Sequence, residues 1–170
     1  MKRIVAEAAI GRILSAMVLV LAVLATGCAT SPFDSGDRTV ASLGPAGALQ
    51  EPGRTGAEVI WGGRIVGIVN SAEHTELEVL ALPLRSGHRP RRDAEGGVRF
   101  VIRMPGFLEP MNYSPGRYVT ALGRYVGIES RSVGSFNVDH PVLEGRQLEL
   151  WPVDPNRRNT RFSLGVGVRL

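Results

Sequence analysis

Few side chains in this 170-residue chain have the type and spacing that chemistry requires. The single cysteine, Cys28, lies in the stretch VLATGCATSP and has no second thiol with which to form a disulfide. The three histidines, His74, His88 and His140, have no further histidine or cysteine at ligand spacing. We therefore expect turn or surface positions for the histidines and no metal site, and the cysteine is the residue that most needs an explanation.

Patterns for nucleophilic or acid–base catalysis are weak elsewhere in the chain. The sole lysine, Lys2, lies in the first segment, so the rest of the chain has no Ser–Lys dyad. Glu76 and Glu78 would share one strand face about 7 Å apart, a separation that suits a glycosidase but is also ordinary for a solvated strand face. The chain also lacks a Gly-rich phosphate loop between a strand and a helix. These observations predict a protein that is not an enzyme and that needs no cofactor.

Residues 1–27 have the layout of a secretory signal peptide. A positively charged start, MKRIVAEAAIGR, precedes an apolar run over residues 13–25, and the small residues Thr26 and Gly27 follow. The run is too short to span a bilayer comfortably as a helix, which takes about 20 residues. The segment therefore predicts export and removal rather than a membrane span.

The residues before Cys28 resemble the lipobox of bacterial lipoproteins, in which an aliphatic residue and two small residues precede a cysteine. Ala25, Thr26 and Gly27 occupy these places here. The resemblance implies that the lipoprotein processing machinery cleaves between Gly27 and Cys28 and acylates Cys28, which would be the only covalent lipid. Acylation would also remove a lone thiol from an oxidising compartment. An ordinary signal peptide that leaves a free thiol is the alternative.

The residue after the cysteine, Ala29, bears on sorting. In the enteric lipoprotein rule, aspartate at this place retains a lipoprotein at the inner membrane, so Ala29 implies export by the sorting machinery to the outer membrane. We expect the acyl anchor to hold the protein in that bilayer at the periplasmic face.

Residues 28–57 are rich in small residues and proline, without a sustained apolar period. The composition predicts a lipidated N-terminus followed by a flexible tether. The stretch TVASL within it is a candidate for a first strand that docks on the domain.

Charge gives little support for a nucleic-acid ligand. The chain has 20 basic and 16 acidic residues, and its arginines are scattered apart from RPRR at 89–92 and RRNTR at 157–161. Nucleic-acid binders present a basic patch or stripe. We interpret the two clusters as solvated loops.

Residues 58–153 carry the patterns of a small β domain. Five segments are β-branched or alternate apolar with polar residues, namely 58–70, 75–84, 96–104, 116–128 and 145–153. A Gly62–Gly63 pair in the first segment predicts a bulge or bend. Residues 105–116, rich in proline and glycine, leave room for about one helical turn between the third and fourth strands.

This order of elements is that of an OB fold. We predict an all-β, small five-stranded OB-like barrel with a short helical turn between strands three and four, preceded by the signal peptide and tether. An unrelated β-sandwich is the alternative. Residues 154–170 end in FSLGVGVRL, which predicts an extra edge strand or a C-terminal tail.

Four blocks of this domain resemble the Slp family of outer-membrane lipoproteins, named for a starvation-inducible lipoprotein of enteric bacteria. In order, they are WGGRIVGIVN, TELEVLALPL, GFLEPMNYSPGRYVTALGRYVG and LELWP, and they follow a lipobox. Glu109 stands where the family pattern has aspartate, and the aromatic-rich tail of some members is absent. The resemblance implies an outer-membrane location, a stress-linked role in the envelope and no established enzymatic activity.

The block GFLEPMNYSPGR has two interpretations. As a recognition loop, Phe107, Leu108 and Tyr113 would present an apolar patch beside Glu109 and Arg117. As a plug, the segment would close one end of the barrel, with Glu109 capping the turn and pairing with Arg117. We favour the plug.

The sequence as a whole predicts a non-enzymatic outer-membrane lipoprotein that acts in envelope maintenance or starvation stress through an unknown envelope partner. The alternative is a periplasmic binding module for an envelope glycan or another oligomeric ligand. OB-like barrels bind such ligands on the face of strands two and three, where Arg99 and Arg103 would lie.

Overall fold

The computed structural model describes residues 31–33, 36 and 38–153. Its strands are β1 (Glu58–Asn70), β2 (His74–Ala81), β3 (Arg99–Pro105), β4 (Tyr118–Val133) and β5 (Phe136–Trp151). One α-helix, α2 (Pro45–Gln50), and two 3-10 turns, η1 (Pro52–Arg54) and η2 (Ser86–His88), accompany them. The predictions for the signal peptide, for cleavage and acylation at Gly27 and Cys28, and for the tail at 154–170 lie outside the described residues.

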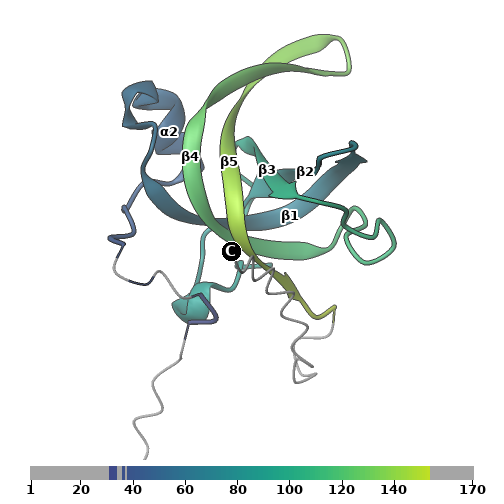
Figure 1. The fold of residues 1–170 in the computed structure, drawn as a ribbon, viewed down its shortest axis with the longest axis horizontal. Helices are drawn as coiled ribbons and strands as arrows, with labels where there is room; N and C mark the ends of the chain where they lie inside the picture. The colour runs from purple at the N-terminus through teal and green to yellow at the C-terminus, as the bar shows by residue number, and fades with distance from the viewer. Residues whose placement is uncertain (1–30, 34–35, 37, 154–170) are drawn as a thin grey trace, which may run out of the picture. The chain divides into compact units, whose positions relative to one another are not determined.

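The five strands close into a ring in the order β1-β2-β3-β5-β4, with β4 returning to β1 (Figure 1). All neighbouring strands are antiparallel except β3 and β5, which pair in parallel through residues 101–103 and 142–144. This arrangement confirms the predicted all-β, five-stranded architecture. Among the described residues, no helix is both long enough and apolar enough to cross a membrane.

Glycines allow the long strands to pass close to their neighbours. A Cβ on Gly63 would lie 2.0 Å from the carbonyl oxygen of Leu80, and a Cβ on Gly123 would lie 2.1 Å from that of Glu144. The Gly62–Gly63 pair is therefore a place of close backbone approach. The register shift in β1 occurs slightly later, between Ile65 and Gly67, where β1 pairs with β2.

Aromatic side chains occupy the centre of the barrel. The Trp61 ring lies 5.4 Å from that of Phe100 and 5.7 Å from that of Tyr125, and all three side chains are buried. Aliphatic residues from every strand fill the remaining space, among them Ile65, Leu77, Ile102, Val119 and Leu143. The inward positions alternate with polar outward ones, as in β2, where every second residue is buried.

The segment before β1 packs on the barrel and is not a free tether. Ala41 donates a backbone hydrogen bond to Glu58, and Leu43 and Ala48 are buried in the core. Two core side chains bond to this segment, since Trp61 Nε1 donates to the Leu43 carbonyl at 2.6 Å and Tyr125 Oη donates to that of Ala48 at 3.1 Å. The tether predicted for 28–57 therefore does not extend over residues 41–54, which belong to the folded domain. The segment joins it as a helix and turn and not as the strand considered for TVASL.

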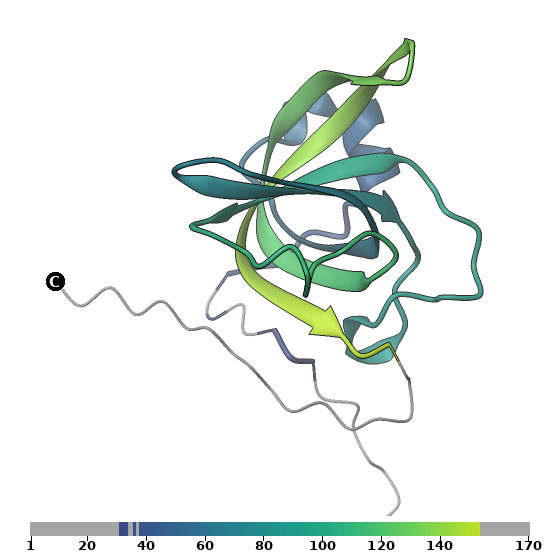
Figure 2. The ribbon, with the colours of Figure 1, turned by 90° about the vertical axis from the view of Figure 1, so that its right-hand side faces the viewer.

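The β4–β5 hairpin is longer than the sequence patterns predicted. The strands pair from Tyr118 and Trp151 out to Val133 and Phe136, joined by a two-residue turn in which Gly134 has a φ of 62°. Figures 1 and 2 both show the far half of this hairpin projecting beyond the ring. Residues 129–133 and 136–144, which lay outside the predicted strands, are therefore strand.

Candidate functional site

The projecting hairpin lies over the outer surface of β2 and β3, and charged side chains from all three elements meet there. We define this charged face by three glutamates and three arginines, Glu76, Glu78, Arg99, Arg103, Glu129 and Arg131. Register sets the positions, because Glu76 lies directly opposite Arg103 across the β2–β3 pair. Alternation places all six side chains on the outward side of their strands.

Four of these groups form a closed ion-pair network. The Glu76 carboxylate accepts from Arg103 Nη2 at 2.7 Å and from Arg131 Nη1 at 2.8 Å. Glu129 accepts from the same two guanidiniums, at 3.0 Å from Arg103 and 2.5 Å from Arg131. Each arginine thus bridges both carboxylates, and β2, β3 and β4 are linked through their side chains.

This network fixes the protonation states of its members. The hydrogen bond from Arg131 is the main cause that lowers the pKa of Glu76 to about 2, and Arg103 adds to it against the opposing effect of burial. Arg131 likewise lowers the pKa of Glu129 most, and the two carboxylates raise the pKa of both arginines. A carboxylate that is ionised throughout the neutral range accepts hydrogen bonds but is a poor general acid.

The remaining pair of the charged face involves a buried histidine. Arg99 donates to Glu78 at 2.7 Å, and His140 Nε2 lies 3.4 Å from the same carboxylate oxygen. His140 is fully buried, and its Nδ1 lies 2.7 Å from the Val138 carbonyl. The predicted surface position is therefore wrong for His140, because this residue lies opposite Glu129 in the β4–β5 hairpin and is covered where the hairpin meets Glu78 of β2.

The arginines expected on the strand-two and strand-three face are thus present but neutralised. Arg99 pairs with Glu78 and Arg103 pairs with Glu76 and Glu129. The glutamate partners on β2 were visible in the sequence, whereas Glu129 and Arg131 were missed because the fourth predicted strand ended at residue 128. The face therefore carries no net charge for attracting an anionic oligomer.

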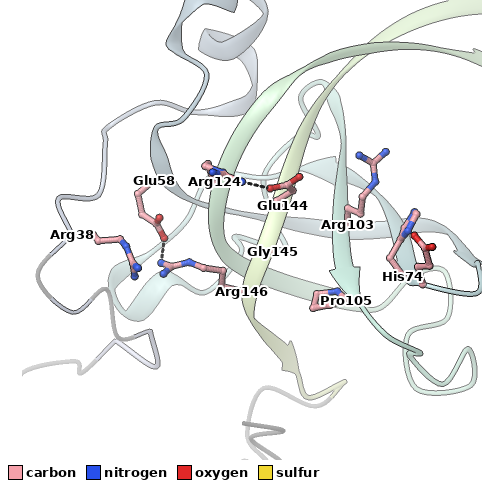
Figure 3. Close-up of a pocket in the computed structure, with 10 residues that line it drawn as sticks. Arg38, Glu58, His74, Arg103, Pro105, Arg124, Glu144, Gly145 and Arg146 are labelled. Carbon is pink, nitrogen blue, oxygen red and sulfur yellow. Dashed lines mark hydrogen bonds and ion pairs between the residues drawn. The ribbon is translucent and has the colours of Figure 1, made fainter. Parts of the chain in front are cut away.

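A cleft of about 520 Å³ borders this face, between the start of β1, the middle of β5 and the β1–β2 turn (Figure 3). Two ion pairs cross its floor, Arg124 with Glu144 at 2.7 Å and Arg146 with Glu58. Its lining supplies both hydrogen-bond donors and carboxylate acceptors, from Arg38, Glu58, Glu73, His74, Arg103, Arg124, Glu144 and Arg146. Such a lining suits a polar, hydroxyl-rich ligand better than an apolar one.

The loop between β3 and β4, residues 106–117, is held against one end of the barrel. Leu108 is buried, and its amide and carbonyl bond to the Thr75 hydroxyl at 2.9 Å and to Asn70 Nδ2 at 3.1 Å. Thr75 Oγ1 also lies 2.9 Å from the Gly106 carbonyl. Tyr113 packs against the core, and burial raises the pKa of its phenol. Leu108 and Tyr113 thus close the barrel end, as the plug interpretation holds.

The outward residues of this loop follow the prediction in part. Glu109 begins a single turn, in which its side-chain Oε1 accepts from the Met111 amide at 3.4 Å and its carbonyl accepts from the Asn112 amide at 3.0 Å and the Tyr113 amide at 3.2 Å. The Arg117 guanidinium donates to the Asn112 and Trp151 carbonyls and not to Glu109. Phe107 remains 66% exposed, and Met111, which the sequence argument passed over, is 82% exposed.

The three histidines lie apart. His74 is at the start of β2, 3.6 Å from Glu76, and His88 lies in η2 beside Ser31. Within the part of the chain that the structure describes, no three histidine, cysteine, aspartate or glutamate side chains gather as a metal site would require.

Comparison with known proteins gives the family. Residues 25–165 match the outer membrane lipoprotein Slp family. The chain belongs to this family. It is also similar to the outer membrane protein Slp of Escherichia coli K12, with 25% identity over 139 residues, which cover 80% of this chain and 73% of that protein.

Two further relatives match shorter stretches. An uncharacterized protein of Haemophilus influenzae is 32% identical over 91 residues, or 53% of this chain, and the match spans about half, 49%, of that protein. The uncharacterized lipoprotein YeaY of E. coli K12 is 28% identical over 111 residues, 59% of this chain and 57% of that protein. No solved structure matches.

Proposed function

We propose that this Slp-family lipoprotein is anchored by acylated Cys28 at the periplasmic face of the outer membrane and acts there without catalysis, by binding an envelope partner. The family match supports the anchor, because it begins at residue 25 and so includes the residues that resemble a lipobox. A role in envelope maintenance or starvation stress is the biological setting we propose for that binding.

One observation carries the choice of binding over catalysis. The charged face consists of carboxylates and guanidiniums that hold each other ionised, and the pKa of Glu76 is lowered to about 2. Catalytic acids and bases instead have pKa values close to the working pH. A preformed, neutral network of charges favours selective contact with a complementary surface.

The exposed side of the 106–117 loop is the contact that we propose for a protein partner. Phe107 and Met111 project from a segment whose backbone is fixed by Thr75, Asn70 and the buried Leu108. Apolar side chains held on a rigid support lose little entropy on binding, which suits an envelope protein with an apolar pocket.

The anchor is tested with the substitution Cys28→Ser. We expect labelled palmitate to enter the native protein and not the variant, and outer-membrane fractions to contain only the former. Equal labelling of both proteins, or native protein found mainly in the inner membrane, would contradict the proposed anchor.

The contact is tested by photo-crosslinking in cells, with a crosslinker at Phe107 or Met111 and a control at the exposed Arg54 on η1. We expect one protein adduct from the two loop positions, absent from the control and lost when Phe107→Asp is introduced beside the Met111 crosslinker. Identical adducts from all three positions, or none from the loop in growing and starved cells, would refute the contact.

A second candidate function rests on the cleft of Figure 3. Its volume of about 520 Å³ and its mixed donors and acceptors favour an envelope glycan as ligand. Titration with peptidoglycan and lipopolysaccharide oligosaccharide fragments is expected to shift NMR signals of cleft residues in the native protein, and Arg146→Gln is expected to weaken this binding while Arg54→Gln does not. A panel without any shift would remove this candidate.

A further inference from the structure

Residues 85–93, here called the arginine loop, hold the most unbalanced charge in the described domain. The loop follows β2, includes η2 and contains four arginines, Arg85, Arg89, Arg91 and Arg92, against one acid, Asp93. The charged face, in contrast, matches three arginines with three glutamates. A positive site on this domain is therefore to be sought at the loop and not on the strand face.

The arginine loop is held by a buried chain of hydrogen bonds. Trp151 Nε1 donates to Thr120 Oγ1 at 2.9 Å, and the Thr120 hydroxyl donates to the His88 carbonyl at 2.8 Å. Both Trp151 and Thr120 are buried. The Arg85 amide bonds to the Arg89 carbonyl across the loop at 2.8 Å. These contacts give the loop a defined shape, so its guanidiniums start from fixed backbone positions.

Aromatic rings orient two of the guanidiniums. Arg89 lies over the Trp151 ring at 4.8 Å and Arg92 over the Tyr118 ring at 4.6 Å. With Arg85, they line a cleft of about 430 Å³ whose floor includes Trp151.

The guanidiniums of this cleft differ in the partners they already have. Asp93 pairs with Arg85 at 2.7 Å, and Arg92 donates to the backbone carbonyls of Pro152 and Val153. For Arg89, the described residues supply the stacking ring but no carboxylate or carbonyl acceptor. The N–H groups of Arg89 therefore line the cleft without an acceptor among the described residues.

The start of the described chain docks on the same loop. Ser31 Oγ lies 2.8 Å from His88 Nδ1, and the Phe33 ring meets the His88 ring edge-on at 5.8 Å. Cys28 precedes Ser31 by three residues, and a trans chain spans at most about 3.6 Å per residue, so the anchor lies within about 11 Å of Ser31. If Cys28 is acylated as proposed above, this short stretch of chain keeps the arginine loop close to the lipid headgroups.

We propose that the arginine loop binds the phosphate of an anionic membrane lipid in the leaflet that holds the acyl chains of Cys28. A guanidinium offers paired donors that match two phosphate oxygens, and stacking on an aromatic ring leaves that edge of Arg89 free. This inference rests on the proposed acyl anchor and adds to it a headgroup preference and an orientation of the domain.

The test uses the full acylated chain in vesicles, with hydrogen–deuterium exchange of the peptide that covers residues 84–93. Phosphatidylcholine vesicles are compared with vesicles that also contain phosphatidylglycerol, whose phosphate is not offset by a choline. Each arginine near an anionic surface contributes about a fivefold factor. We expect exchange in this peptide to be at least about fivefold slower in the anionic vesicles, and the difference to disappear in high salt.

Arg89→Gln is expected to reduce this protection to about a fifth, whereas the matched exposed control Arg54→Gln keeps it. Equal exchange in both vesicle types, or the same loss in both variants, overturns the inference. Slowing by soluble glycerol phosphate but not by anionic vesicles also overturns it, because the site would then bind a free anion. The mass of the N-terminal peptide reports acylation separately, so a missing anchor and an inactive arginine loop give different results.

Discussion

Among the residues of the charged face, Glu76 is the one whose substitution we expect to lower the free energy of unfolding most. Its side chain is 18% exposed, and its carboxylate accepts from both Arg103 and Arg131. Its pKa falls from 4.5 to about 2, and at about 1.4 kcal/mol per unit this shift corresponds to about 3 kcal/mol of folding free energy. Solvent on the open side of the face reduces this figure, so we expect Glu76→Gln to lower the free energy of unfolding by about 2 kcal/mol at pH 7.

The sign of the pH dependence follows from the lowered pKa. A carboxylate with a depressed folded-state pKa stabilises the protein above its unfolded value of 4.5, and this stabilisation is lost as the pH falls toward 2. The difference between native protein and Glu76→Gln should therefore be constant from pH 7 to pH 5 and shrink by more than half by pH 3. The native protein should lose the contribution of the Glu76 carboxylate over this acidic range, whereas Glu76→Gln has no such contribution to lose.

Urea unfolding followed by tryptophan fluorescence at several pH values measures the difference. The matched control is Glu144→Gln, which breaks the pair with Arg124, in which both side chains are about half exposed, and should change stability by less than about 0.5 kcal/mol. A Glu76→Gln deficit no larger than that of the control at pH 7, or one that does not change between pH 5 and pH 3, would refute the reasoning.

Three further substitutions test the fold around the site. Trp61→Phe removes the buried bond to the Leu43 carbonyl, should cost about 1 to 2 kcal/mol, and should speed hydrogen exchange in residues 41–54 more than elsewhere. Gly63→Ala places a Cβ 2.0 Å from the Leu80 carbonyl oxygen, so we expect a loss of about 3 kcal/mol or more, seen as a large drop in Tm. Thr75→Val leaves the amide of the 106–117 loop without its hydroxyl acceptor and should cost about 2 kcal/mol, with faster proteolysis of that loop in the variant than in the native protein.

The barrel strands could be predicted because their burial is one-sided. In β2 every second residue is buried, and this produces the alternation that sequence patterns detect, whereas the first halves of β1 and β4 show runs of buried β-branched and small residues instead. Beyond Ile128 the hairpin leaves the ring, and much of it meets solvent on both faces, so the apolar alternation disappears although pairing continues. The Gly134–Ser135 turn was the available signal, since such two-residue turns are typical of hairpins.

The N-terminal segment was missed for a different reason. Its composition of small residues and proline is that of a tether, and its helix contributes only one fully buried side chain, Ala48. The segment is held by hydrogen bonds that the Trp61 and Tyr125 side chains, from other parts of the chain, donate to its backbone carbonyls. No local pattern encodes such bonds. The Gly44–Pro45 pair at the start of α2 was a weak local signal, because proline favours the first position of a helix.

With the proposed anchor and headgroup contact, charge and shape together would give the domain a direction relative to the membrane. In both ribbon views the arginine loop at η2 and the tip of the β4–β5 hairpin lie at opposite ends of the domain (Figures 1 and 2). An anionic surface attracts the end with unbalanced arginines, whereas the charged face carries as many glutamates as arginines and gains nothing from approaching it. Docking through the arginine loop would therefore turn the hairpin away from the bilayer, toward partners in the periplasm. A domain held only by a free tether would have no such preference.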